Sequence, residues 1–161
     1  MAAVAFSAQS ARLHHVGITV TDLDRAIAFW ERLLGVQARR RTTLDGPRVG
    51  VLVGYPGARI ERCWMDLPGG VELELVQYLG RHDEPYDEGT AHPGNVHLCL
   101  LVGDMAAAHA HATECGASPV GGPIDILAGP FAGGRTAYLR NPDGVTLELL
   151  ELPPTDVNHL L

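Results

Sequence analysis

Two histidines hold matching positions in two similar segments of this 161-residue chain. The first segment, 13-LHHVGITVTDLDRAIAFWERLLG-35, contains His15, and the second, 95-NVHLCLLVGDMAAAHAHATECG-116, contains His97, 82 residues later. In both segments the histidine begins a β-prone stretch, which is followed by an aspartate and a helix-like run ending at a glycine. The repetition predicts one strand–helix unit present twice, with an imidazole at the start of each copy.

Two glutamates repeat in the same manner near the end of each copy. The segment 70-GVELEL-75 matches 144-GVTLEL-149, so Glu74 corresponds to Glu148, 74 residues later. Each glutamate lies within an apolar strand-like stretch, where a buried carboxylate must be paired, protonated or bound to a metal. Matching Val, Leu and Ala residues follow from ordinary strand and helix composition, whereas matching His and Glu residues indicate a shared site.

These four side chains form a donor set for one divalent cation if the two copies face each other. His15, Glu74, His97 and Glu148 offer two imidazole nitrogens and two carboxylate oxygens. This set suits Zn²⁺, Ni²⁺, Co²⁺, Mn²⁺ or Fe²⁺. Each residue taken singly is more often structural, so the symmetric set of four is what predicts one divalent metal ion per site.

The elements that must position these side chains follow from the spacing of apolar residues. Alternation with β-branched residues predicts strands, and an apolar stripe that ends at Gly35 predicts a helix starting after Thr21 or Asp22. In the first copy the predicted strands are 13–20, 49–53, 62–67 and 71–78. In the second copy the predicted elements are a helix over 104–114, capped by Gly116, and strands over 96–102, 136–140 and 145–150. The chain is therefore expected to be α+β, with two βαβββ modules over 12–80 and 94–154 joined by a linker over 81–93.

The bulk composition excludes several classes of partner. All 12 basic residues are arginines and the formal net charge is −7, so no basic face for nucleic acid is indicated. Arg39, Arg40 and Arg41 are expected in a solvated loop or at a strand edge rather than in a phosphate site. Three cysteines without a CxxC pair are typical of reduced thiols in the cytoplasm. No apolar run approaches the roughly 20 residues of a membrane span, and residues 1–12 resemble a loose tail more than a signal peptide.

The chain resembles the vicinal oxygen chelate superfamily, which includes glyoxalase I, methylmalonyl-CoA epimerase, extradiol dioxygenases and fosfomycin-resistance enzymes. The resemblance covers roughly residues 13 to 152 and rests on 13-LHHVGITVTDLDRAIAFWERLLG-35, 72-ELELVQY-78, 94-GNVHLCLLVGDM-105 and 138-YLRNPDGVTLELLEL-152. It implies that each βαβββ module forms half of a cupped mixed sheet around a metal site. It also implies that the ligands lie on the first and last strands of each module. Carried over residue by residue, these ligands are His15, Glu74, His97 and Glu148.

Neighbouring residues compete with two of these ligands. Glu72 shares the strand face of Glu74, and Glu74 is preferred because it aligns with Glu148 across the repeat. His14 precedes His15 and is expected to point to the opposite face. In the family the ligand is the histidine directly before Val-Gly, which favours His15.

Two further residues are candidate substrate contacts. Arg135 and Tyr138 lie at the end of a glycine-rich loop, 121-GGPIDILAGPFAGGR-135. This loop is either a lid over the pocket or a plain hairpin connection. It lacks the Gly-Lys-Ser/Thr ending of a phosphate loop.

The resemblance implies proton transfer at a carbon next to a carbonyl. The set His-Glu-His-Glu is that of glyoxalase I and is close to the His-Gln-His-Glu of methylmalonyl-CoA epimerase, whereas extradiol dioxygenases and fosfomycin-resistance enzymes use His-His-Glu. We expect a metal-dependent epimerase or isomerase in which the catalytic residues Glu74 and Glu148 move an α-proton through a metal-bound enolate. The expected substrate is a small keto-sugar of the cyclitol type or an acyl-CoA.

Two other functions stay open at this point. One is a lyase of the glyoxalase I type acting on a lactoylthiol, although the sequence shows no basic cluster for the carboxylates of a glutathione conjugate. The other is a drug-binding resistance protein without catalysis, a group that commonly lacks the metal quartet. Exposed sheet edges favour a homodimer, and the site is expected either within one chain or shared between two.

Overall fold

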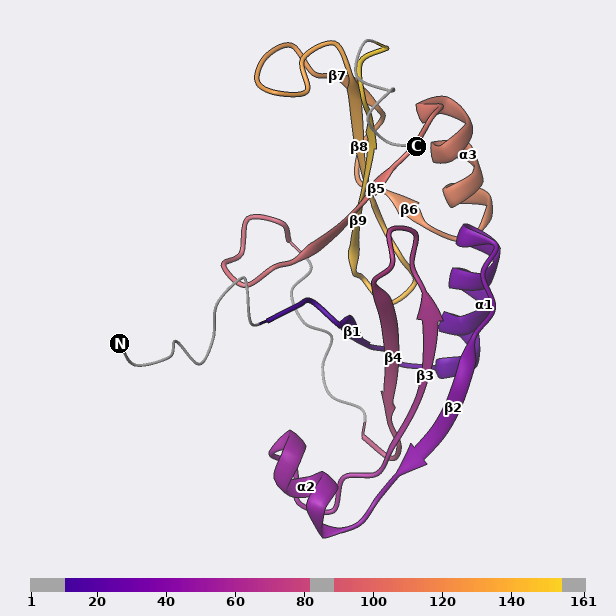
Figure 1. The fold of residues 1–161 in the computed structure, drawn as a ribbon, viewed down its shortest axis with the longest axis vertical. Coiled ribbons are helices and arrows are strands. Elements are labelled where there is room, and N and C mark those ends of the chain that lie inside the picture. Colours follow the sequence, from indigo (N-terminus) through magenta and orange to yellow (C-terminus); the bar gives the residue numbers. More distant parts are fainter. Residues whose placement is uncertain (1–10, 82–88, 155–161) are drawn as a thin grey trace. The chain divides into compact units, whose positions relative to one another are not determined.

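The computed structural model describes residues 11–81 and 89–154, which form two compact units divided between residues 82 and 83. Most of the predicted tail over 1–12 and of the predicted linker over 81–93 lies outside the described residues. Each unit contains its own sheet and a long helix, so the fold is mixed α+β (Figure 1).

The first unit has six described elements in the order β1 (His15–Thr19), α1 (Leu23–Leu34), β2 (Arg39–Leu44), α2 (Pro47–Val53), β3 (Ile60–Asp66) and β4 (Glu72–Tyr78). Its sheet has the order β1-β4-β3-β2, in which β1 is parallel to β4 and the other neighbours are antiparallel. Helix α1 covers one face of this sheet (Figure 1). Leu73 and Leu75 of β4 are fully buried, as are Phe29 and Trp30 of α1. The opposite face of β4 is therefore left to its polar residues.

Helix α1 begins and ends at the residues that the sequence predicts. The Asp22 carboxylate accepts a hydrogen bond from the backbone N–H of Arg25 at 2.9 Å, which satisfies one of the free amides of the first turn. Gly35 ends the helix with φ = +68°, a left-handed conformation that glycine adopts without steric cost.

The prediction of a strand over 49–53 is wrong, because these residues lie in helix α2. Pro47 occupies the start of the helix, where its fixed φ is favourable and its missing N–H is not needed. Val49 packs with Ala58 and Ile60 in a small core of its own. A short apolar run does not by itself distinguish a buried strand from a buried helical turn. The three adjacent arginines begin β2, an edge strand of the sheet, in agreement with one of the two placements expected for them.

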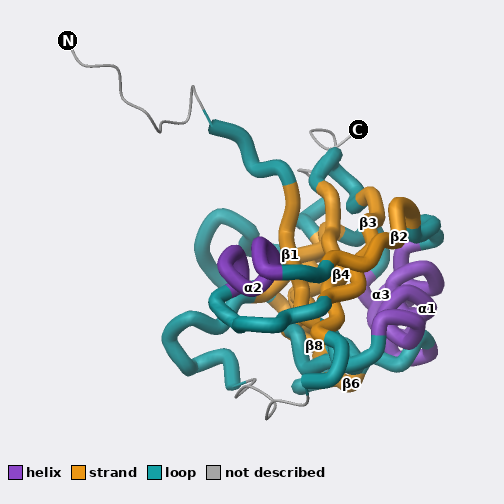
Figure 2. Tube along the Cα trace, turned by 90° about the horizontal axis from the view of Figure 1, so that it is seen from below, coloured by secondary structure: helices purple, strands orange, loops and turns teal. Residues whose placement is uncertain are grey.

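The second unit has the order β5 (His97–Leu101), α3 (Met105–Glu114), β6 (Ser118–Pro119), β7 (Ile124–Asp125), β8 (Arg135–Arg140) and β9 (Thr146–Glu151). Its sheet has the order β5-β9-β8-β6, and β7 also pairs with β8. Helix α3 contacts β8 and β9 on one face of this sheet (Figures 1 and 2). The helix starts after Asp104, which caps its first turn, and ends at Glu114 as predicted, but its C-cap is Cys115 rather than Gly116. The short strands β6 and β7 have no counterpart among the sequence-based predictions.

The two sheets repeat each other in register as well as in strand order. In the first unit β1 runs parallel to β4 with His15 opposite Glu72 and Gly17 opposite Glu74. In the second unit β5 runs parallel to β9 with His97 opposite Thr146 and Cys99 opposite Glu148. The partners differ by 82 residues on the first strands and by 74 on the last strands, so the repeat predicted from the sequence is confirmed at the level of strand pairing.

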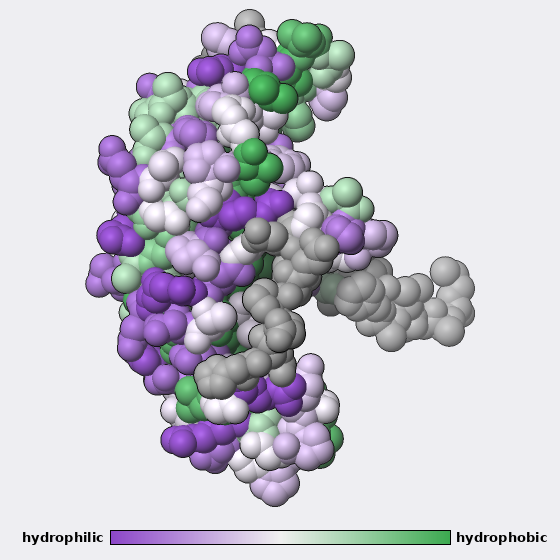
Figure 3. Space-filling model, turned by 180° about the vertical axis from the view of Figure 1, so that it is seen from behind, coloured by the Kyte–Doolittle hydropathy of each residue, from purple (hydrophilic) through white to green (hydrophobic). Residues whose placement is uncertain are grey.

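The surface is hydrophilic over much of the face shown in Figure 3, with separate hydrophobic areas. In the first unit, α2 exposes Val51 and Leu52, and in the second the loop around β7 exposes Ile124, Leu127 and Phe131. Among the described residues, none of the helices combines the length and the hydrophobicity that crossing a membrane requires.

Candidate metal-binding site

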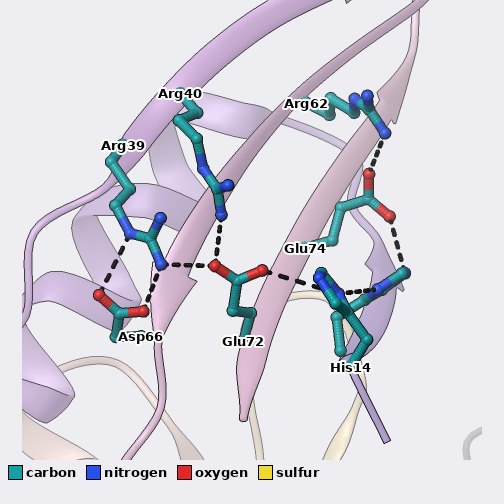
Figure 4. Close-up of polar contacts among 8 residues, drawn as sticks. His14, Arg39, Arg40, Arg62, Asp66, Glu72 and Glu74 are labelled. Carbon is teal, nitrogen blue, oxygen red and sulfur yellow. Dashed lines mark hydrogen bonds and ion pairs between the residues drawn. The ribbon is translucent and has the colours of Figure 1, made fainter. Parts of the chain in front are cut away.

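In the first unit, one imidazole and one carboxylate meet on the sheet face opposite α1. His15 Nε2 lies 3.4 Å from Glu74 Oε2, and the two side chains are 39% and 12% exposed. The parallel pairing of β1 with β4 produces this contact, because it places both residues at one end of adjacent strands. The other carboxylate oxygen, Oε1, accepts a hydrogen bond from Arg62 Nη1 at 2.6 Å (Figure 4). Arg62 comes from β3, the other neighbour of β4.

In the second unit, the equivalent residues meet in the same way. His97 Nε2 lies 3.0 Å from Glu148 Oε2, and the two side chains are 45% and 20% exposed. Glu148 Oε1 accepts a hydrogen bond from the Thr136 hydroxyl at 3.1 Å. Each carboxylate therefore has one oxygen facing an imidazole and the other held by a residue of the adjacent strand.

An aromatic ring lies beside each imidazole. In the first unit the centroids of His15 and Trp64 are 4.9 Å apart with nearly perpendicular planes. In the second unit the centroids of His97 and Tyr138 are 5.5 Å apart with tilted planes. Sequence reasoning identified Tyr138 but missed Trp64, although the two residues are 74 positions apart like the glutamates.

Arg62 and Thr136 were also missed, and the same signal identifies them. They precede Glu74 and Glu148 by 12 residues each and are themselves 74 positions apart. Extending the alignment of the two glutamate motifs back along the chain would have shown that one copy has a guanidinium where the other has a hydroxyl.

Glu72 is engaged by arginines rather than by His15. Arg39 and Arg40 both donate to Glu72 Oε1, and Arg39 also binds Asp66 (Figure 4). Burial alone would raise the pKa of Glu72, but these two arginines outweigh it and hold the pKa below its ordinary value. The carboxylate that faces the His15 imidazole is therefore Glu74.

The expectation that His14 points away from His15 is wrong. His14 lies just before β1, so the alternation of strand side chains does not apply to it. Its Nδ1 lies 3.0 Å from Nδ1 of His15, and its ring packs edge-on against Trp64 at 6.0 Å. Nδ1 of His14 is also 3.7 Å from Glu72 Oε2, so the two histidines and both glutamates form one row (Figure 4).

The two candidate substrate contacts lie on different sheet faces. Tyr138 pairs across the strands with Glu148 and shares its face. Arg135 pairs with Glu151, whose carboxylate binds the backbone N–H of Met105 on the helix side of the sheet. Arg135 itself pairs with Asp125 of β7 at 3.5 Å, so the structure does not bring it together with Glu148.

The groups around Glu148 are kept in their neutral forms. Although Cys99 is exposed, desolvation by neighbouring side chains raises the pKa of its thiol to about 11, and the nearby charge of Glu148 adds to this shift. Burial and the charge of Glu148 also raise the pKa of Tyr138. At neutral pH both side chains are therefore protonated hydrogen-bond donors beside the carboxylate.

The donor chemistry of each pair fits half of a metal site. An imidazole nitrogen and a carboxylate oxygen are ordinary ligands for first-row divalent ions. Within the part of the chain that the structure describes, no three His, Cys, Asp or Glu side chains gather closely enough to hold an ion. Neither pair completes a coordination shell by itself.

Comparison with known proteins identifies the family. The model of the Glyoxalase/Bleomycin resistance protein/Dioxygenase superfamily matches residues 14–138. The chain belongs to this superfamily. The match spans both units and confirms the resemblance seen in the sequence motifs.

Relatives within the superfamily include an epimerase and several lyases. A 2-epi-5-epi-valiolone epimerase of an Actinomyces species is 32% identical over 145 residues, covering 88% of this chain and 79% of that protein. A lactoylglutathione lyase of Haemophilus influenzae is 30% identical over 139 residues, covering 85% and 90%. Among solved structures, a glyoxalase family protein from Bacillus cereus superposes with a TM-score of 0.73 at 25% identity, covering 88% and 94%.

Proposed function

We propose that this protein is a metal-dependent epimerase that inverts a carbon next to a carbonyl group in a small keto-cyclitol or keto-sugar. The observation that carries the proposal is the pair of equivalent imidazole–carboxylate contacts, one in each unit and at the same strand register. The name of the Actinomyces relative, 2-epi-5-epi-valiolone epimerase, supports this substrate class over an acyl-CoA.

The proposed ligands of the metal are His15, Glu74, His97 and Glu148, two from each unit, from one chain or from two chains of a homodimer. In both pairs the imidazole presents Nε2 and the carboxylate presents Oε2, so each unit offers one nitrogen and one oxygen. When bound, a divalent ion acts as a Lewis acid on the substrate oxygens and stabilises the negative charge of the enolate.

Glu148 is the proposed base that removes the α-proton. Besides the His97 imidazole, the groups identified around it among the described residues are the Thr136 hydroxyl, the Cys99 thiol and the Tyr138 phenol. These neutral groups orient the carboxylate without fixing it in an ion pair. A water molecule, or Glu74 after taking up a proton from water, then returns a proton to the opposite face of the carbon, which inverts it.

Tyr138 is the proposed donor to a substrate oxygen. Its pKa is raised by burial, so the phenol stays protonated at neutral pH. It shares a sheet face with Glu148 and packs beside His97, the two residues of the proposed site in this unit. A hydroxyl donor of this kind suits a polyhydroxylated neutral substrate.

The test is α-proton exchange in D₂O, followed by NMR, with the metal-loaded full chain and keto-cyclitols. We expect exchange together with inversion, and loss of both in His15→Ala and His97→Ala. His92→Ala is the matched control, because His92 lies in a loop outside both pairs. Lack of exchange with every keto-sugar and thioester, together with O₂ uptake on catechols, would overturn the assignment.

A lyase of the glyoxalase I type is the second candidate, because several relatives are named lactoylglutathione lyase at 30–33% identity. It is tested with the hemithioacetal of methylglyoxal and glutathione under the same conditions. Rapid turnover of this compound without inversion of keto-cyclitols would replace the epimerase with the lyase. A purified protein without stoichiometric metal would instead favour a drug-binding role.

A further inference from the structure

We propose that Arg62 and His14 are positioning residues that hold the imidazole–carboxylate pair of the first unit in the arrangement a metal requires. The inference rests on the proposed function, because it concerns two ligands of the same site. It assigns a role to the side chains that flank His15 and Glu74 in the first unit, namely His14, Arg62 and Glu72 (Figure 4).

Arg62 fixes the carboxylate of Glu74. Its Nη1 donates to Oε1 at 2.6 Å, which leaves Oε2 on the side of the His15 imidazole. The guanidinium is itself held against the ring of Trp64, with Cζ 5.5 Å from the ring centroid. A charge-assisted hydrogen bond from a supported guanidinium restricts the rotation of the carboxylate more than a hydroxyl does.

His14 fixes the ring of His15. The two Nδ1 atoms are 3.0 Å apart, so one ring donates and the other accepts, and Nε2 of His15 is left facing Glu74. His14 lies in turn 3.7 Å from Glu72, which Arg39 and Arg40 bind from the other side. An imidazole ligand is commonly oriented through its second nitrogen in this manner.

The second unit shows that these flanking side chains are not needed for the imidazole–carboxylate contact to form. At the positions of Arg62, His14 and Glu72 the second copy has Thr136, Val96 and Thr146. The imidazole–carboxylate contact nevertheless forms there, at 3.0 Å and in the same register. Arg62, His14 and Glu72 therefore position the ligands of the first unit and are not required for the strand pairing.

Outer partners of metal ligands typically contribute about 10- to 100-fold to metal affinity. The matched experiment compares two arginines of the same sheet, each bound to one glutamate of a neighbouring strand. Arg62 binds Glu74 on the ligand face, whereas Arg41 binds Glu61 at 2.8 Å on the face of α1. Arg41 also binds Asp24 of α1, so its substitution removes an arginine–glutamate contact and one further ion pair from the opposite face.

Affinity for Zn²⁺ and Co²⁺ is measured by competition with a chromophoric chelator, using the full chain. We expect Arg62→Gln and His14→Phe each to lower the affinity at least tenfold and to alter the visible spectrum of bound Co²⁺. Arg62→Lys should restore part of the affinity, and Arg41→Gln should leave it unchanged. Circular dichroism and thermal melting establish that each variant is folded.

An affinity of Arg62→Gln equal to or above that of the wild type would overturn the inference, because the guanidinium would then only compete with the metal for Glu74. An equal loss in Arg41→Gln would also overturn it, since the effect would then be one of sheet stability. Failure of the proposed function is recognised separately: the wild-type chain itself then binds no metal, or binds it unchanged in His15→Ala and His97→Ala.

Discussion

The two units carry the same imidazole–carboxylate pair in different surroundings. In the first unit Glu74 is bound by Arg62 and has Gly17 opposite it on the neighbouring strand. In the second unit Glu148 is bound by a hydroxyl and has Cys99 opposite it. The backbone of the strand pair is repeated, and the side chains around it are not.

The difference bears on the roles proposed for the two glutamates, metal binding and proton transfer. A carboxylate in an ion pair with a guanidinium is restrained, which suits a permanent ligand. A carboxylate that accepts a hydrogen bond from a neutral hydroxyl keeps more freedom, which suits a group that must approach the substrate and accept a proton. We therefore propose that metal binding rests mainly on the first unit and proton transfer mainly on the second.

The largest expected effect tests this division directly. Glu148→Gln should lower α-proton exchange and inversion together by about 10²- to 10⁴-fold, the usual contribution of a general base. Glu74→Gln should retain exchange while slowing inversion, because it leaves the base that removes the proton in place. Both rates are measured by NMR in D₂O at saturating metal, since glutamine keeps an oxygen ligand. Equal loss of exchange in the two variants would remove the proposed difference between the units.

Much of the fold could be predicted because its signals are local or repeated. Asp22 and Asp104 start their helices as expected, since a carboxylate that caps the first turn needs only nearby residues. The repeat fixes the strand pairing, because equivalent residues must pair equivalently. The prediction of a strand over 49–53 was wrong because an apolar run of five residues is too short to show a strand or helix period. Pro47 at the start of this segment favours a helix.

The candidate site could be predicted only in its repeated part. His15 and Glu74 each meet the partner that the repeat indicates. The repeat marks Arg62 as equivalent to Thr136, but not its contact: Arg62 is paired with Val76 and reaches diagonally past Trp64 to Glu74, which is a tertiary property. His14 was misplaced because alternation holds only inside a strand, and β1 begins one residue later.

Metal removal gives the next largest effect and tests whether both units bind the same ion. At a free metal concentration 100 times its Kd, binding stabilises the folded state by about 2.7 kcal/mol. For a chain of this length, that corresponds to a Tm shift of roughly 5–10 °C. We expect chelation to lower the Tm of the wild type by this amount, and His15→Ala and His97→Ala each to abolish the shift. A shift that survives in one of these variants would assign the ion to the other unit alone.

A smaller effect is expected from the aromatic rings beside the histidines. Tyr138→Phe should lower kcat about 2- to 10-fold, because it removes one neutral hydrogen bond worth about 0.5–1.5 kcal/mol. Trp64→Phe should leave kcat within about twofold, because the ring in the first unit is proposed only to support Arg62 and the imidazoles. Both predictions are checked by measuring the steady-state kcat of the two variants. A larger loss of kcat in Trp64→Phe would place substrate contact in the first unit.

The smallest expected effect concerns the thiol that distinguishes the two strand pairs. With a pKa of about 11, Cys99 is only about one part in a thousand thiolate at pH 8, so iodoacetamide should label it slowly and faster as the pH rises. Desolvation of the thiol by neighbouring side chains is the main cause of the raised pKa, and the charge of Glu148 is the second. Glu148→Gln should therefore lower the pKa modestly and speed labelling a few-fold at constant pH, as followed by mass spectrometry of the Cys99 peptide. Cys99→Ala identifies the labelled site. Labelling of the Glu148→Gln protein at the wild-type rate would mean that the charge of Glu148 does not affect the Cys99 thiol. The thiol would then not be one of the neutral groups that orient the proposed base.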